Sequence, residues 1–402
     1  MLRFVGSKNT HKMCCGLQLL SFMFMLLGVL LCSRTRWSTE SSPTPSPSGN
    51  NTTSSAPSWL LLSSGKKNLT SFTPSDRCNT WDCICFRKDH VDCDATRHGL
   101  RVIPKVPSNT RYFRMWRANL QTVSRHTLSN LSYVPLVYLV LDFNNITHIT
   151  ADAFQDLVNL TSITLRGNRI PASTLRACFF SIVSPSLSAL ALDNMNLAAT
   201  PDGLFDGLAG KRVRLLSLDS NHITAFNNAA FARFAKITTL RLRDNHISEL
   251  SLSSRAHVGK IVLSRNLLTE VPDFCLKMAE NETSGKPTNA FEHLVSLDLG
   301  ENQLQHLSKK RLSRDCLPDL EKLYIRSCPG LRVLENNLIS DLPKVRYLAL
   351  ANLTSLRRYE PLAFNSSTLM KLLLMRNRAI NYRSVQISEI FRRLPKLKVS
   401  VL

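Results

Sequence analysis

One spacing of apolar residues recurs along most of this chain. In residues 237–247 the sequence reads I-T-T-L-R-L-R-D-N-H-I, with apolar residues at offsets 0, 3, 5 and 10 and Asn245 at offset 8. The residues at offsets 3 and 5 lie two apart, which predicts a short strand that points both of them toward one face. Asn245 follows where the chain must turn off that strand. One such segment cannot bury its apolar side alone, so it requires copies stacked above and below it.

Copies of this spacing recur mostly at intervals of 24 to 27 residues. Weaker copies have Met195, Cys328 or Leu353 where asparagine is expected, and a degenerate first copy includes Phe113. The register resembles that of the leucine-rich repeat. This resemblance implies an α/β-type repeat solenoid, a horseshoe with a concave parallel β-sheet and a convex side of irregular segments and short helices. The regular copies, given by first residue and asparagine, are Leu136 and Asn144, Leu160 and Asn168, Val213 and Asn221, Val258 and Asn266, Leu294 and Asn302, and Leu369 and Asn377.

Composition divides the chain into five segments. Residues 1–13 are basic, residues 14–33 carry no charge, and residues 34–76 are rich in Ser, Thr and Pro. Residues 77–109 contain four cysteines, and residues 110–402 hold about twelve repeats, the last of them incomplete. Because the last repeat breaks off without a cysteine cap, we expect an incomplete gene product rather than a deliberate open end.

The uncharged segment 14–33 predicts export from the cytosol. It is long enough to cross a bilayer, and the residues before Arg34 form a poor cleavage site, so both an uncleaved signal anchor and a cleaved signal peptide remain open. The following segment predicts a disordered, O-glycosylated stalk. Nine N-x-S/T sequons fit an exported glycoprotein. They are Asn50, Asn51, Asn68, Asn130, Asn145, Asn159, Asn281, Asn352 and Asn365.

Four cysteines lie close together in C-N-T-W-D-C-I-C-F-R-K-D-H-V-D-C, residues 78–93. Zinc binding is the alternative to disulfides, but the spacing is not the paired C-x-x-C form and the compartment is oxidising. Two disulfides that cap the first coil explain the cluster better, since the apolar end of a solenoid would otherwise face water.

The cysteine cluster and the V-I-P-K-V-P that follows it closely resemble the N-terminal cysteine flank of extracellular leucine-rich-repeat proteins. Those include Slit-type guidance proteins, Toll-like receptors and small leucine-rich proteoglycans, and the resemblance covers residues 78–402. In that family the first cysteine pairs with the third and the second with the fourth. This implies Cys78–Cys85 and Cys83–Cys93, although the chain lacks the usual proline after its first cysteine and has wider spacing.

The same resemblance implies that Phe154, Phe205, Phe231 and Phe364 stack into an internal spine. Between residues 266 and 302 the period lengthens to 36, so an insertion must loop out there.

The remaining cysteines fall into two kinds. Cys275, which lies within the insertion, and Cys316 in the next coil could face each other across adjacent returns. A disulfide between them and two free thiols both remain open. Cys178 and Cys328 are expected to be small buried apolar residues.

Catalytic and nucleotide-binding motifs are absent from the sequence. G-x-S-x-G, H-E-x-x-H, P-loop and dinucleotide glycine patterns do not occur. We therefore expect no enzyme activity, no cofactor, no metal site and no nucleic-acid partner. Function is expected on the concave sheet.

The C-terminal strands predict a basic surface. Residues 301–402 hold 19 Lys and Arg against 8 Asp and Glu, in a chain of net charge +22. This charge suits an acidic protein or a sulfated glycan, and the alternative is a solvated face that is basic by composition alone. The expected outward positions of the last four strands are Lys322, Tyr324 and Arg326, then Tyr347, Ala349 and Ala351, then Lys371, Leu373 and Met375, then Lys396, Lys398 and Ser400.

A second aromatic group lies near the first repeat: Tyr112, Arg114, Trp116 and Tyr138. Exposed Trp and Tyr beside Arg are typical of binding hot spots, and packing under the cysteine cap is the alternative. The sequence thus favours an extracellular or cell-surface binding module for adhesion, guidance or receptor-like recognition. Its alternatives are the ectodomain of a Toll-like pattern-recognition receptor and a matrix protein that binds sulfated glycosaminoglycan.

Overall fold

This computed structural model describes residues 82–86, 89–96, 100–276, 288–360, 362–377 and 393–401. All of them belong to one compact unit, Thr70–Leu402, and the other unit, Met1–Leu69, lies outside the described residues. The predicted export segment and stalk therefore also lie outside them. Within the described ranges no helix is both long and apolar enough to span a bilayer.

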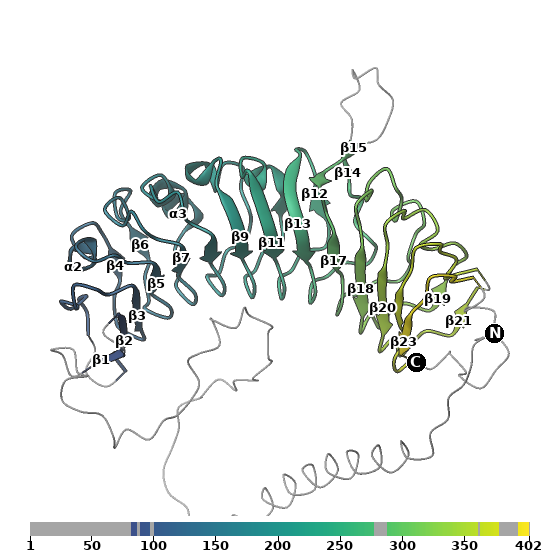
Figure 1. Cartoon of the computed structure of the whole chain (residues 1–402), viewed down its shortest axis with the longest axis horizontal. Helices are drawn as coiled ribbons and strands as arrows, with labels where there is room; N and C mark the ends of the chain where they lie inside the picture. Colours follow the sequence, from purple (N-terminus) through teal and green to yellow (C-terminus); the bar gives the residue numbers. More distant parts are fainter. Residues whose placement is uncertain are drawn as a thin grey trace, which may run out of the picture. The chain divides into compact units, whose positions relative to one another are not determined.

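The strands lie side by side along an arc, and each coil contributes one strand to a single sheet (Figure 1). β1 (Cys83–Phe86) and β2 (His90–Asp94) pair antiparallel, and β2 then pairs parallel with β3 (Tyr112–Trp116). Each later pairing described in this sheet is parallel, which confirms the predicted solenoid. Its further strands are β5 (Tyr138–Val140), β7 (Ser162–Thr164), β8 (Ala189–Ala191), β9 (Arg212–Ser217), β11 (Lys236–Arg241), β13 (Ala256–Val262), β17 (Ser296–Asp298), β18 (Lys322–Arg326), β20 (Tyr347–Ala351), β22 (Lys371–Leu373) and β23 (Val399–Val401).

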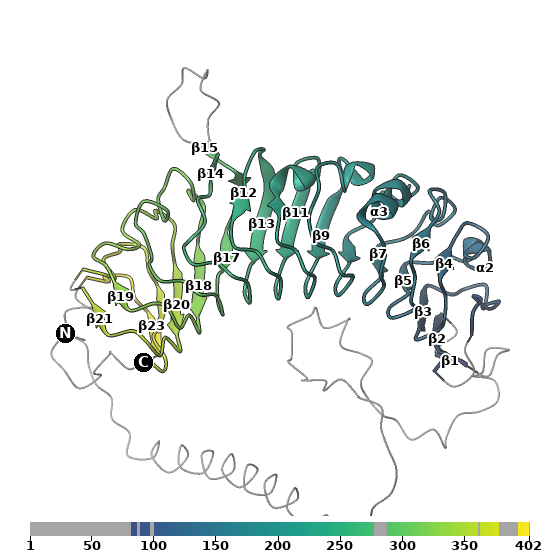
Figure 2. The same cartoon turned by 180° about the vertical axis from the view of Figure 1, so that it is seen from behind.

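The outer side of the arc carries short helices and short strand pairs, as the repeat resemblance implied (Figure 2). The helical segments are α2 (Ser129–Ser132), α3 (Ala172–Phe179) and the 3-10 turns η4 (Asp206–Leu208) and η5 (Asn228–Phe231). The paired strands are β4 (Thr122–Val123) with β6 (His148–Ile149), β10 (Phe226–Asn227) with β12 (Leu250–Ser251), β14 (Cys275–Leu276) with β15 (Thr288–Asn289), and β19 (Val333–Leu334) with β21 (Arg358–Tyr359). A further short strand, β16 (Phe291–Glu292), pairs with the first residues of β13 in the main sheet.

The asparagine at offset 8 of a regular coil is buried and joins two coils. The Asn221 Nδ2 donates to the carbonyls of Leu192 and Leu218, and its Oδ1 accepts from the N–H groups of Met195 and Leu197. These bonds satisfy backbone groups that the turn would otherwise leave unpaired. Bonds of the same kind are made by Asn144, Asn168, Asn245, Asn266, Asn302 and Asn377.

The residue at offset 7 of each coil has a left-handed backbone, which turns the chain off the strand. Gly167 occupies this position in one coil with a φ of 66°. In the other coils a residue with a side chain adopts the same conformation. These residues are Arg117, Phe143, Asn194, Ser220, Asp244, Arg265, Glu301, Ser327, Asn352 and Arg376.

Aromatic rings fill the returning halves of the coils. Phe154, Phe205, Phe231 and Phe364 are all buried. The Phe205 ring centroid lies 5.6 Å from that of Phe179 and 5.5 Å from that of Phe231. Phe205 and Phe231 thus stack as predicted, whereas Phe364 lies 6.2 Å from the ring of Tyr359, so the spine is confirmed only for the central coils.

The cysteine cap adds two strands to the start of the sheet. Cys83 and Cys93 lie opposite each other in β1 and β2 and form a disulfide, which is the pairing that the family implied. Cys85 is disulfide-bonded too, and its predicted partner Cys78 lies outside the described residues. Phe113 of the first coil is fully buried, so the cap covers the apolar end of the solenoid.

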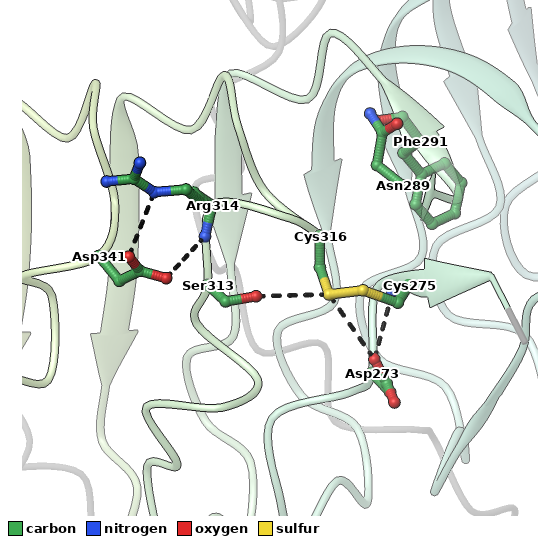
Figure 3. The surroundings of a disulfide bond; sticks show 8 residues. All are labelled: Asp273, Cys275, Asn289, Phe291, Ser313, Arg314, Cys316 and Asp341. Atoms are coloured by element: carbon green, nitrogen blue, oxygen red, sulfur yellow. Dashed lines mark hydrogen bonds and ion pairs between the residues drawn. A yellow bond between two sulfur atoms is a disulfide. The ribbon is translucent and has the colours of Figure 1, made fainter. Parts of the chain in front are cut away.

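Cys275 and Cys316 form a second disulfide, 41 residues apart in sequence (Figure 3). The Asp273 Oδ1 accepts the N–H of Cys275 at 3.2 Å. Because Cys275 lies in the β14–β15 hairpin, the disulfide ties the base of the insertion to the next coil. Cys178 and Cys328 are free and buried, as expected.

Candidate binding surface on the concave sheet

Six side chains on four strands of the concave sheet form what we name the basic–aromatic patch. Its cationic members are Lys260 of β13, Lys322 and Arg326 of β18 and Lys371 of β22, and its aromatic members are Tyr324 of β18 and Tyr347 of β20. In the register Lys322 lies opposite Tyr347, which in turn lies opposite Lys371. Five of these six residues are ones that the sequence predicted for the concave face, and the structure places them on adjacent strands.

Stacking between rings and cations organises the patch. The ring centroids of Tyr324 and Tyr347 lie 5.0 Å apart. The Arg326 Cζ lies 5.6 Å from the Tyr324 centroid, and the Lys371 Nζ lies 5.4 Å from the Tyr347 centroid. Both distances fall within the ~6 Å range of cation–π attraction. The rings therefore hold both cations close to the sheet.

One carboxylate lies next to the patch, on a strand that precedes the last four. On the adjacent strand β17, Asp298 forms an ion pair of 3.1 Å with Arg326, whose side chain is 49% exposed. An exposed ion pair of this kind stabilises the fold by only ~0–1 kcal/mol. The main effects of Asp298 are to orient the Arg326 side chain and to offset one of the four positive charges of the patch.

Lys260 is the member of the patch that the sequence prediction missed, because it lies on β13, before the basic last quarter of the chain. Burial lowers the pKa of Lys260; Asp298 raises that pKa, and the charges of Arg241, Lys322 and Arg326 lower it further. Three cations therefore lie close enough to destabilise the charge on Lys260. A bound anion would relieve this repulsion.

The prediction for the last strand is wrong by three residues. In β23, Ser400 lies opposite the buried Leu372, whereas the sequence spacing placed it on the concave face. Lys396 and Lys398 are exposed, but they precede β23 rather than project from it. The buried Leu394 accepts a hydrogen bond that closes a turn just before the strand, and this turn takes up the extra residues.

Met375 follows β22 and is 40% exposed, so it stands beside the patch without belonging to its stacked part. Ala349 of β20 is fully buried, and neighbouring side chains cover it.

In the central coils, cations and carboxylates on the concave side pair with each other. Arg241 forms an ion pair with Asp219, and Arg166 pairs with Asp193 at 2.9 Å. Burial raises the pKa of Asp219 in spite of its arginine partner. The Oδ1 of Asp219 also accepts the N–H of Arg243 in the next coil. The bonds of Asp219 to Arg241 and Arg243 thus join neighbouring coils.

The aromatic group near the cap lies beside β2, and its Tyr112 packs against the cap, while the predicted binding role stays a prediction. The Tyr112 ring stacks on His90 of the cap at 3.8 Å and lies 6.1 Å from the Tyr138 ring. Burial raises the pKa of Tyr112 to about 12. Arg114 and Arg117 each place their Cζ over the Trp116 ring, at 4.4 Å from the ring centroid.

Among the sequons in the described part of the chain, Asn145, Asn159 and Asn352 are exposed. Asn130 and Asn365 are half-buried, and their side-chain amides donate hydrogen bonds within the protein. Asn50, Asn51, Asn68 and Asn281 lie outside the described residues.

Comparisons with known proteins agree with this architecture. The family model of the leucine rich repeat matches residues 108–170 and 185–247. Podocan-like protein 1 of Mus musculus is 26% identical over 318 residues, which cover 71% of this chain and 55% of that protein. Keratocan of Gallus gallus is 24% identical over 300 residues, which cover 67% of this chain and 80% of that protein. Lumican of Coturnix japonica is 24% identical over 254 residues, which cover 59% of this chain and 71% of that protein.

This chain thus spans little more than half the length of podocan-like protein 1. The solved LRIM1/APL1C complex aligns with a TM-score of 0.46 and 18% identity, covering 76% of this chain and 60% of that chain. Keratocan and lumican are small leucine-rich proteoglycans, and the Cys83–Cys93 bond is one that the cysteine flank of such proteins implies. The chain is thus similar to small leucine-rich proteoglycans, and it combines leucine-rich repeats with an N-terminal cysteine flank.

Proposed function

We propose that this chain is a non-enzymatic binding module and that its basic–aromatic patch binds an acidic segment of a protein partner. One observation carries the proposal. Lys260, Lys322 and Lys371 stand on the concave face, and within the described residues none of the three is in an ion pair. Most other parts of the concave face lack such a group.

The arrangement concentrates positive potential where a partner can reach it. β13 and β18 both lie next to β17 in the sheet, and neighbouring strands are ~4.8 Å apart. The electric fields of the cations on β13 and β18 therefore add at the surface. Lys322 and Lys371 are exposed, and among the described residues Asp298 is the one carboxylate in an ion pair with a member of the patch. The patch therefore favours a partner with several negative charges.

The two tyrosines favour a protein over a glycan. Tyr324 and Tyr347 are half-buried, so each ring keeps an accessible part between the cations. Aromatic and arginine side chains dominate the energy of protein interfaces because they offer large rigid contact area. A sulfated glycosaminoglycan is the second candidate, since lysines on neighbouring strands alone would attract its sulfates.

Binding of two probes distinguishes these candidates. The probes are a heparin oligosaccharide and an acidic peptide with leucines between its glutamates. Lys322→Glu with Lys371→Glu should weaken binding of the preferred probe at least about tenfold, or ~1.4 kcal/mol. The matched control, Arg212→Glu with Lys236→Glu, changes the net charge equally at exposed positions outside the patch and should have little effect.

The tyrosines then separate the two partner classes. Tyr324→Ala with Tyr347→Ala should weaken peptide binding several-fold and heparin binding less, because the charges stay in place. Equal effects of the patch and control reversals on both probes would show that net charge, and not this surface, drives binding.

We also propose that the repeats act outside the cell, whether anchored or released. A mature N-terminus near Arg34 in the medium would identify a cleaved signal peptide. Retention of Met1 in membranes washed with alkaline carbonate would identify an anchor. Repeats that stay in the cytosol without glycans would contradict the proposal.

A further inference from the structure

Two histidines and one glutamate meet where the chain returns from the insertion to the sheet. His257 lies on β13, Glu292 ends β16, and His293 follows it. The donor atoms of the three side chains all lie within 4.8 Å of one another. They are half-exposed or exposed, so an ion from solvent can reach them.

The spacing approaches that of a metal site. In a tetrahedral zinc site with bonds of ~2.0–2.2 Å, neighbouring ligand atoms lie ~3.3 Å apart. The His257 Nδ1 and the Glu292 Oε2 are 3.1 Å apart. The rings of His257 and His293 have centroids 6.3 Å apart. Side-chain rotation is therefore enough to bring all three donors around one ion.

A carboxylate supports one of the two imidazoles from behind. The Asp319 Oδ2 lies 3.3 Å from the Nδ1 of His293, and Lys344 binds the other oxygen of Asp319. A metal-bound histidine commonly donates its second ring N–H to a carboxylate, which fixes the ring. With its Nδ1 directed at Asp319, His293 keeps its Nε2 for an ion.

The backbone at His293 is a second, independent observation. Its φ is 60°, a left-handed conformation. His293 directly precedes Leu294, the first residue of a regular copy, so it does not belong to the turn at offset 7 that repeats along the chain. Such outliers cluster at functional sites, because the surrounding structure must stabilise them.

We propose that His257, Glu292 and His293 bind one divalent transition-metal ion, and that the ion is Zn²⁺. Two imidazoles and one carboxylate form a donor set that suits zinc and leaves a fourth position for water or a partner's side chain. The ion joins β16, which follows the insertion, to β13. Arg255 lies 3.8 Å from the Glu292 Oε1, so the carboxylate binds the ion through its other oxygen.

The neighbouring cluster of Asp273, Cys275 and Cys316 does not compete for this role. Its two sulfur atoms are joined in a disulfide, so they offer no thiolate.

The test is a titration of the exported chain, prepared without a histidine tag, with Zn²⁺ followed by calorimetry. We expect one ion per chain and a cobalt-substituted form with the absorption of a tetrahedral site. His257→Ala and His293→Ala should each reduce the affinity at least 100-fold, and Asp319→Asn should reduce it ~10–100-fold through loss of support. Melting curves without metal verify that the variants fold.

A second histidine pair provides the matched control. His222 and His246 stack at 5.2 Å on the exposed turns of two central coils. His222→Ala with His246→Ala should leave zinc binding unchanged. No binding at micromolar Zn²⁺, or binding that the control weakens as much as His257→Ala does, would overturn the proposal. Neither result bears on the basic–aromatic patch.

Discussion

The central coils and the C-terminal coils use the same repeat in different ways. In the central strands β9, β11 and β13 each coil carries its buried asparagine, and Arg241 on the concave face pairs with Asp219. In the C-terminal strands β18 and β20 the asparagine is replaced by Cys328 and Leu353, and cations stand beside tyrosines. The comparison teaches that groups satisfied by each other stabilise the solenoid, whereas unsatisfied cations remain available to a partner.

The first prediction tests the stabilising side of this comparison. Asn221→Ala removes an amide that bonds five backbone groups of two coils. Each buried group left unpaired costs ~1–3 kcal/mol, so the free energy of unfolding should fall by at least ~3 kcal/mol. Cys328→Ala at the equivalent C-terminal position should cost only ~1 kcal/mol. Chemical denaturation measures both, and equal losses would contradict the role given to the asparagines.

The second prediction concerns the disulfide near the boundary between the two regions. Replacing Cys275 and Cys316 together by Ser opens a loop closed across 41 residues. Loss of that constraint should lower the free energy of unfolding by ~2–4 kcal/mol. The variant should bind the acidic peptide as before, because neither cysteine lies in the patch. A variant that loses binding but not stability would contradict this division.

The third prediction tests the binding side of the comparison by reversing charges in the patch. Changing Lys322, Arg326 and Lys371 to Glu should reduce heparin retention at least about tenfold, ~1.4 kcal/mol. Retention should also fall steeply with salt, since exposed charges are screened beyond ~8 Å at physiological ionic strength. The control changes Arg212, Arg214 and Lys236, which are exposed in or beside the central strands β9 and β11. If both triple variants lose retention equally, the two regions do not differ in function.

The fourth and smallest effect is expected at Lys260. Burial and neighbouring cations lower its pKa, so at neutral pH the folded state holds this charge at a cost. That cost is relieved only as the pH rises through the lowered pKa toward the ordinary value of 10.5. Lys260→Gln should therefore raise the free energy of unfolding by no more than ~0.5 kcal/mol. It should also weaken peptide binding. A variant that is less stable and binds normally would be inconsistent with this account.

Much of the fold follows from the sequence because one period sets the register of every coil. The offsets placed Tyr324, Tyr347 and Lys371 on neighbouring strands of one face, as the structure shows. They failed at the last strand, where Leu394 and Leu397 allow two frames three residues apart and no asparagine selects between them.

The rest of the site depends on geometry that a period does not contain. The approach of Asp298 to Arg326 and the environment of Lys260 depend on distances between side chains of adjacent coils. The His257 cluster depends on how an insertion of irregular length returns to the sheet, so no repeat offset predicts that its three side chains meet.

The most direct measurement of the central claim is the acetylation rate of single lysines, read by mass spectrometry with and without the acidic peptide. Lys322 and Lys371 should become protected when the peptide binds, while Lys236 on the central strand β11 should react at an unchanged rate. Protection of Lys236 equal to that of Lys322, or no protection of Lys322 and Lys371 at a saturating peptide concentration, would contradict binding at the basic–aromatic patch.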